Sequence, residues 1–75
     1  MGYMGQQHRK SVAEVTRREH EVIHLIAQGL SNREIGRRLR IAVRHVSSSV
    51  RRIAEKLQIH TRLEIAAYAR RNGND

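Results

Sequence analysis

The chain has 75 residues, no cysteine and a formal net charge of +8. This length allows one small domain with a modest core, and the lack of cysteine excludes disulfide bonds and cysteine-ligated zinc as supports for it. No apolar run approaches the roughly 18 residues of a membrane span, and no charged-then-apolar leader opens the sequence, so we expect a cytoplasmic protein.

Arginine supplies most of the positive charge, since 13 of the 15 basic residues are Arg. Its planar guanidinium group suits phosphate, which makes nucleic acid the favoured class of partner. Residues 33–52 contain seven arginines and a single acid, Glu34. The alternative is a solvated basic face that only keeps the protein soluble. So many like charges in a short region repel one another unless a polyanion relieves them.

Residues 1–14 are rich in Gly and Gln and aperiodic until Val12, so we expect a flexible tail or a linker remnant there and a folded domain over residues 15–73. Three capping boxes then predict three helix starts. In each box a Ser or Thr caps the helix and a Glu three residues later reaches back to the cap amide. These pairs are Thr16 with Glu19, Ser31 with Glu34, and Thr61 with Glu64.

The first two predicted helices lie on either side of Gly29, which is expected to end the first one. Residues 16–28 carry an apolar stripe typical of an amphipathic helix, formed by Val22, Ile23, Leu25, Ile26 and Ala27. The second helix begins at Ser31 and places Ile35 and Leu39 four residues apart. Gly36 lies between them and weakens the helix, so we expect it to allow the close approach of another backbone.

The third and fourth predicted helices complete the domain. Residues 43–57 carry a regular apolar seam of Val46, Val50, Ile53 and Leu57, and Ala42 stands where a capping residue would be expected. The fourth helix runs from Thr61 to about Asn72, with Gly73 as its stop. No segment alternates with period two, and the chain has no proline. The sequence therefore predicts an all-α fold with four helices.

The second helix, a short turn at residues 40–42 and the third helix have the spacing of a helix-turn-helix, with helix three as recognition helix. Many further positions at fixed spacing form one pattern: Thr16, Arg18, Glu19, Glu21, Val22, the run Gly29–Ile35, Leu39, Ile41, Lys56, Leu57, Arg62 and Glu64. By these positions, over about residues 15–72, the chain closely resembles the DNA-binding domain of LuxR/NarL/GerE-type bacterial transcription regulators.

Candidate DNA contacts come from the residues and from the resemblance together. On helix three, Arg44 and Arg51 can reach guanine edges or phosphates, and Arg52 is placed for the backbone. The amides at the start of helix two offer a phosphate site. The resemblance adds Arg18, for which an intramolecular pair with a Glu is an equal alternative. The full set is Arg18, Ser31, Asn32, Arg33, Arg44, His45, Ser47, Ser48, Arg51 and Arg52.

The chain departs from the family pattern at its expected reading surface. Where the family usually has Thr-Val-Lys-x-His, this chain has residues 45–49, His-Val-Ser-Ser-Ser. Ser47 and Ser48 then occupy the family's base-contacting positions, while Arg51 keeps a cation at another. The alternative is that the serines are weak helix formers that merely fill surface positions. The resemblance therefore implies a retained scaffold and an altered reading surface.

His20, Glu21 and His24 satisfy the H-E-x-x-H pattern of zinc peptidases, with both histidines on one helical face. A third histidine six residues on would fall at Leu30, and so short a chain leaves little room for a substrate cleft. We expect no enzyme, no cofactor and no resident metal. Adventitious zinc or nickel binding is the weaker alternative.

The resemblance implies sequence-specific binding of double-stranded DNA in bacterial transcription regulation. It also implies a homodimer through helix four, with Leu63, Ala67 and Tyr68 as interface candidates, and it leaves room for an upstream regulatory domain or a partner protein. No membrane contact is expected. Two alternatives remain open: a protein-interaction module that has lost base reading at residues 47–49, and a nonspecific nucleic-acid binder.

Overall fold

The computed structural model describes residues 15–72, so the tail expected at residues 1–14 and the helix stop at Gly73 lie outside the described residues. Regular structure within residues 15–72 is entirely helical, which confirms the predicted all-α class. The helices are α2 (Arg17–Ala27), α3 (Asn32–Leu39), α4 (Val43–Leu57) and α5 (Arg62–Arg71). In this part of the chain, no helix has the length and apolar character to cross a bilayer.

All three predicted capping boxes are formed. The hydroxyl groups of Thr16, Ser31 and Thr61 each accept from the backbone amide of the Glu three residues later, at 3.1 Å. In each box the Glu carboxylate accepts in return from the amide of the capping residue. The fourth start also agrees with the sequence, because Ala42 precedes α4 without any side-chain cap.

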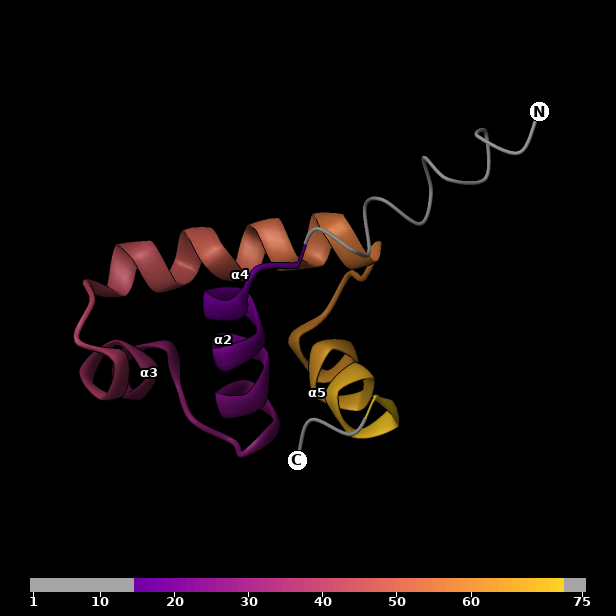
Figure 1. Ribbon diagram of the computed structural model, residues 1–75, viewed down its shortest axis with the longest axis horizontal. Helices are drawn as coiled ribbons and strands as arrows, with labels where there is room; N and C mark the ends of the chain where they lie inside the picture. The colour runs from indigo at the N-terminus through magenta and orange to yellow at the C-terminus, as the bar shows by residue number, and fades with distance from the viewer. Residues whose placement is uncertain (1–14, 73–75) are drawn as a thin grey trace.

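The four helices surround one small core (Figure 1). Helix α4 lies across the others, and α2 packs against both α4 and α5, while α3 packs against α4 (Figure 1). The largest fully buried side chains come from all four helices: Val22, Ile23, Ile35, Val46, Ile53 and Ile65. The predicted seam of α4 supplies Val46 and Ile53 to this core, and Val50 and Leu57 are half-buried beside it.

Gly36 fixes how closely α3 approaches the turn that leads into α4. A Cβ atom added at Gly36 would lie 2.8 Å from the backbone oxygen of Ile41, which is closer than real Cβ contacts allow. The Ile41 amide also donates to the Gly36 carbonyl at 2.9 Å. The expected close backbone approach is confirmed, and it holds the turn before α4 directly against α3.

Candidate nucleic-acid interface

The outward face of α4 carries the polar and basic residues that the sequence assigned to it. Arg44, His45, Ser47, Ser48, Arg51 and Arg52 are all exposed. The opposite face is closed by Val46 and Ile53, neither of which has any exposed surface. Because the core holds α4 along that apolar seam, the outward face is presented to solvent as one continuous stripe.

The serine run is divided between the two faces of α4. Ser47 and Ser48 are exposed, but Ser49 is only 4% exposed and accepts from Arg52 Nη2 at 3.3 Å. Ser49 is therefore part of the packed structure, and the view of all three serines as surface filling is wrong for this residue. The family pattern's histidine falls at this buried position, and the departures from that pattern on the outward face are His45 in place of Thr and Ser47 in place of Lys.

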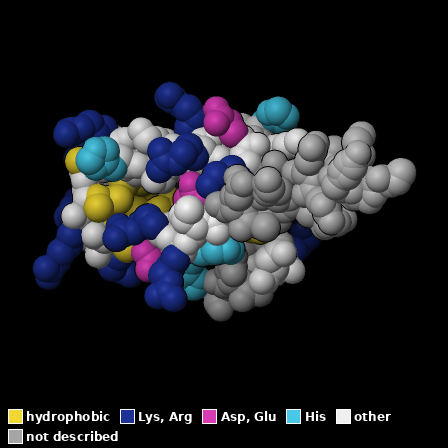
Figure 2. Space-filling view, turned by 45° about the horizontal axis from the view of Figure 1, so that its top comes forward, with side chains coloured by type: hydrophobic (Ala, Val, Ile, Leu, Met, Phe, Trp, Pro, Cys, Tyr) yellow, Lys and Arg dark blue, Asp and Glu magenta, His cyan; other side chains and the backbone are white. Residues whose placement is uncertain are grey.

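Basic side chains extend from α4 onto α3. Figure 2 shows Lys and Arg side chains spread over the half of the visible face on which α3 and the start of α4 lie. The α3 arginines Arg33, Arg37 and Arg38 are exposed, as is Arg40 in the turn. Glu34 lies among them, and its carboxylate accepts from the Ser31 amide, which holds the pKa of Glu34 below its usual range. The surface is thus strongly cationic and suited to a polyanion.

The start of α3 is tied to α4 and α5 by a set of hydrogen bonds that we call the Asn32 bridge: Asn32, Ser47, Arg62 and the Leu30 carbonyl. Asn32 Nδ2 donates to Ser47 Oγ at 3.3 Å. Arg62 Nη1 donates to Asn32 Oδ1 at 2.7 Å, and Arg62 Nη2 donates to the Leu30 oxygen at 2.8 Å. Three helices therefore meet at the edge of the outward face of α4.

Arg62 is a site residue that the sequence-based set omitted. It belongs to the motif that carried the resemblance, yet periodicity and charge gave it no role because its partners lie 30 and 32 residues away in the chain. Its position at the start of α5 was the available signal. A basic residue at a helix N-terminus opposes the helix dipole, so a specific partner elsewhere is expected.

A second cluster, which we call the Glu19 clamp, joins the start of α2 to the end of α4. Glu19 is 3% exposed and accepts from Lys56 Nζ at 2.8 Å, Arg52 Nε at 3.4 Å and the Thr16 amide at 2.9 Å. Burial acts to raise the pKa of Glu19, but the bonds from Lys56, Thr16 and Arg52 together hold it below its ordinary value of 4.5. Glu19 is therefore a buried, charged tie between two helices.

Two of the predicted DNA contacts, Arg52 and Arg18, form ion pairs within the protein. Arg52 pairs with Glu19, although its side chain remains 56% exposed, so a phosphate contact stays a prediction for it. Arg18 Nε lies 3.3 Å from Glu21 Oε1, which is the intramolecular pair that the sequence left open. Both of those side chains are about half exposed, and such pairs contribute little in water, so a phosphate can compete for Arg18.

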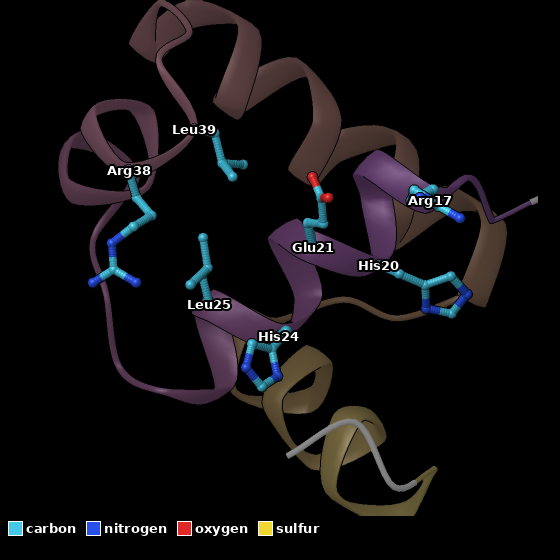
Figure 3. A pocket seen from close by; sticks show the side chains of 7 residues that line it. All are labelled: Arg17, His20, Glu21, His24, Leu25, Arg38 and Leu39. Carbon is cyan, nitrogen blue, oxygen red and sulfur yellow. The ribbon is translucent and has the colours of Figure 1, made fainter.

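The H-E-x-x-H residues line a hollow of about 410 Å³ between α2 and α3 (Figure 3). Figure 3 shows the imidazole rings of His20 and His24 and the carboxylate of Glu21 pointing apart. His24 Nε2 lies 3.1 Å from the side-chain nitrogen of Gln28. Within residues 15–72, no group of three or more His, Cys, Asp or Glu side chains is placed to hold a metal ion.

Comparison with known proteins gives a consistent picture. The family described as "Bacterial regulatory proteins, luxR family" matches residues 13–69. The transcriptional regulatory protein LiaR of Bacillus subtilis is 41% identical over 58 residues, which cover 77% of this chain and 28% of LiaR. DegU of Brevibacillus brevis is 34% identical over 97% of the chain and 31% of its own length. The nitrate/nitrite response regulator NarL of Escherichia coli K12 is 37% identical, covering 79% and 27%. The chain thus spans less than a third of the length of these relatives.

Proposed function

The chain belongs to the luxR family of bacterial regulatory proteins, and from that premise we propose that it binds double-stranded DNA with sequence specificity and thereby regulates transcription. The observation that carries this proposal is the outward face of α4. It is polar and basic and is held by an apolar seam in a helix-turn-helix, which is the arrangement that a recognition helix needs to enter the major groove.

In this proposal the base-reading residues lie on the exposed stripe of α4. Arg44 and Arg51 are two helical turns apart, about 10 Å along the axis, so they can reach edges in the same groove. A guanidinium group matches the two acceptors of guanine, which makes guanine the favoured contact for either arginine. Between them, the short side chains of Ser47 and Ser48 allow the helix to lie close to the bases.

Phosphate contacts hold the helix in that position. Arg33 is exposed at the start of α3, and the backbone amides of Asn32 and Arg33 in the first turn of the helix add a partial positive charge there. His45, Arg18 and Arg52 are also exposed and complete the predicted phosphate-binding set. These contacts supply affinity that does not depend on sequence, and the bases read by α4 supply the preference.

We place a homodimer interface on the outer side of α5. Leu63 is 76% exposed, which is unusual for a large apolar side chain, and it borders a hollow of about 230 Å³ next to Ala66. Ala67 and Tyr68 are half-buried, and Tyr68 packs partly against the core, so Leu63 contributes most of the available apolar surface. Two copies joined at α5 would present two recognition helices to two half-sites.

Regulatory input is proposed to come from outside these 75 residues. The relatives named above are more than three times longer than the segment they share with this chain. We therefore assign signal reception to another domain or to a partner protein. No catalytic step is assigned to this domain.

The direct test is a mobility-shift selection on a pool of random duplexes at moderate salt. Enrichment of a defined sequence over successive rounds is the expected result. Retention of DNA without enrichment would make the protein a nonspecific nucleic-acid binder. The absence of any retention would point to a protein-interaction module, and either result contradicts the proposed function.

A further inference from the structure

Arg62 holds the start of α3 with both terminal nitrogens of its guanidinium group. Nη1 donates to Asn32 Oδ1 at 2.7 Å, and Nη2 donates to the Leu30 oxygen at 2.8 Å. Leu30 and Asn32 flank Ser31, the residue that caps α3. Arg62 itself is the first residue of α5, where a cation opposes the helix dipole. Its own helix does not gain from this charge, and its hydrogen bonds point to a role at α3.

The bond from Arg62 orients the carboxamide group of Asn32. A guanidinium group only donates, so the Asn32 atom that faces Arg62 is the oxygen. The amide nitrogen lies on the side of α4, 3.3 Å from Ser47 Oγ. Ser47 is exposed on the outward face of α4, so this nitrogen lies at the edge of the surface that we propose binds DNA. The bond to Ser47 uses one of the two amide hydrogens and leaves the second.

We propose that Arg62 is a positioning residue, which directs the Asn32 amide nitrogen at the DNA so that its second hydrogen is donated to a backbone phosphate; the inference rests on the proposed DNA binding. A phosphate oxygen accepts, so Asn32 binds it through the nitrogen and not through the oxygen. The terminal torsion of an asparagine is soft, and half a turn exchanges the two atoms. Arg62 prevents that exchange. Because the contact is to a phosphate, it strengthens binding to every duplex alike.

This role depends on the fork of Arg62 rather than on its charge. Arginine has two terminal nitrogens in a fixed plane, one for each acceptor, whereas lysine carries the same charge on a single nitrogen. Arg62→Lys therefore keeps the net charge and removes the double hold on Leu30 and Asn32. Arg62 is exposed, so water can replace its hydrogen bonds, and the variant is expected to fold.

The test is a double-mutant cycle of Arg62→Lys and Asn32→Ala, measured as dissociation constants on a selected and a scrambled duplex. Each single variant should weaken binding to both duplexes by about three- to tenfold, which is the value of one hydrogen bond. In the Asn32→Ala background, Arg62→Lys should weaken binding by no more than about twofold, because the side chain that it positions is absent. A general structural defect caused by Arg62→Lys would persist in that background.

Arg70→Lys is the matched control, because it makes the same substitution at another exposed position of α5. It should leave both dissociation constants unchanged within about twofold. If Arg62→Lys binds as the wild type does, the charge alone is sufficient, and if its loss persists after Asn32→Ala, Arg62 does not act through Asn32. Either result overturns the inference and leaves the proposed function standing, whereas a wild type that binds no duplex overturns both.

Discussion

The two halves of α4 use positive charge for different purposes. In residues 43–51, which we call the open half, the basic side chains Arg44 and Arg51 are exposed on the outward face, and no acid occurs in this segment. In residues 52–57, the clamped half, Arg52 and Lys56 are both bonded to the buried Glu19. The open half begins without a side-chain cap, whereas the clamped half is tied to the capping box of α2.

This difference shows that the density of basic residues does not by itself locate a DNA contact. Arg51 and Arg52 are neighbours, and from the sequence both are expected to contact DNA. Their surroundings differ because successive residues of a helix point about 100° apart, so of these two arginines only Arg52 contacts Glu19, at 3.4 Å. We therefore expect the open half to control DNA binding and the clamped half to contribute first to the stability of the fold.

The largest expected effect is the salt dependence of DNA binding, which follows from the exposed cations of the open half and of α3. If each protomer neutralises about four to six phosphates, log K should fall with log salt at a slope of about −4 to −5. Between about 50 and 200 mM salt the affinity should then drop by roughly 250- to 1,000-fold. Fluorescence anisotropy titrations at several salt concentrations measure the slope, and a flat profile would contradict the cationic interface.

The next effect concerns the clamped half. Glu19→Gln should lower the free energy of unfolding by about 2–4 kcal/mol, because it removes the charge that compensates Lys56 and Arg52 at a buried position. Glu34→Gln is the matched control, since Glu34 has the same capping-box role but is exposed. Urea denaturation measures both variants. Equal losses would mean that the clamp contributes nothing beyond the cap.

Acid should weaken the clamp in the same way. The pKa of Glu19 is lowered in the folded protein, so the unfolded chain binds more protons at mildly acidic pH. The stabilising contribution of Glu19 is therefore complete above its ordinary value of 4.5 and is lost as pH falls through the lower folded value. The stability that the wild type loses in acid through Glu19 should not exceed the stability lost in the Glu19→Gln variant. Thermal melts from neutral pH to about pH 3 should show a smaller acid-induced change for that variant than for the wild type.

Local sequence signals predicted most of the fold. Capping boxes act within four residues, so Thr16, Ser31 and Thr61 marked three helix starts from the sequence alone. The apolar seam of α4 likewise defined its outward face, because a helix of regular period carries every third or fourth residue to the same side. The close approach at Gly36 was also predicted, because a glycine weakens a helix and its presence there indicates that a neighbouring backbone needs the space.

The two clusters at the site could not be predicted in this way. Glu19 was recognised as a capping residue, but its partners Arg52 and Lys56 lie 33 and 37 residues further on, and only the packing of α2 against α4 brings them together. The Asn32 bridge depends equally on the packing of three helices. The burial of Ser49 was missed because three identical residues in a row give no periodic signal, although the seam residues on either side of it indicated the inward direction.

The most direct test of the different uses of the two halves is to measure Arg51→Ala and Arg52→Ala side by side, for unfolding and for binding to preferred and scrambled duplexes. Arg51→Ala should weaken binding to the preferred duplex by about 1–3 kcal/mol, flatten one base-pair preference and leave stability unchanged within about 0.5 kcal/mol. Arg52→Ala should lower stability by about 0.5–1 kcal/mol, since its pair with Glu19 is partly exposed, and weaken both duplexes equally. If the two variants lose the same stability and the same sequence-independent affinity, the division of α4 into an open and a clamped half is contradicted.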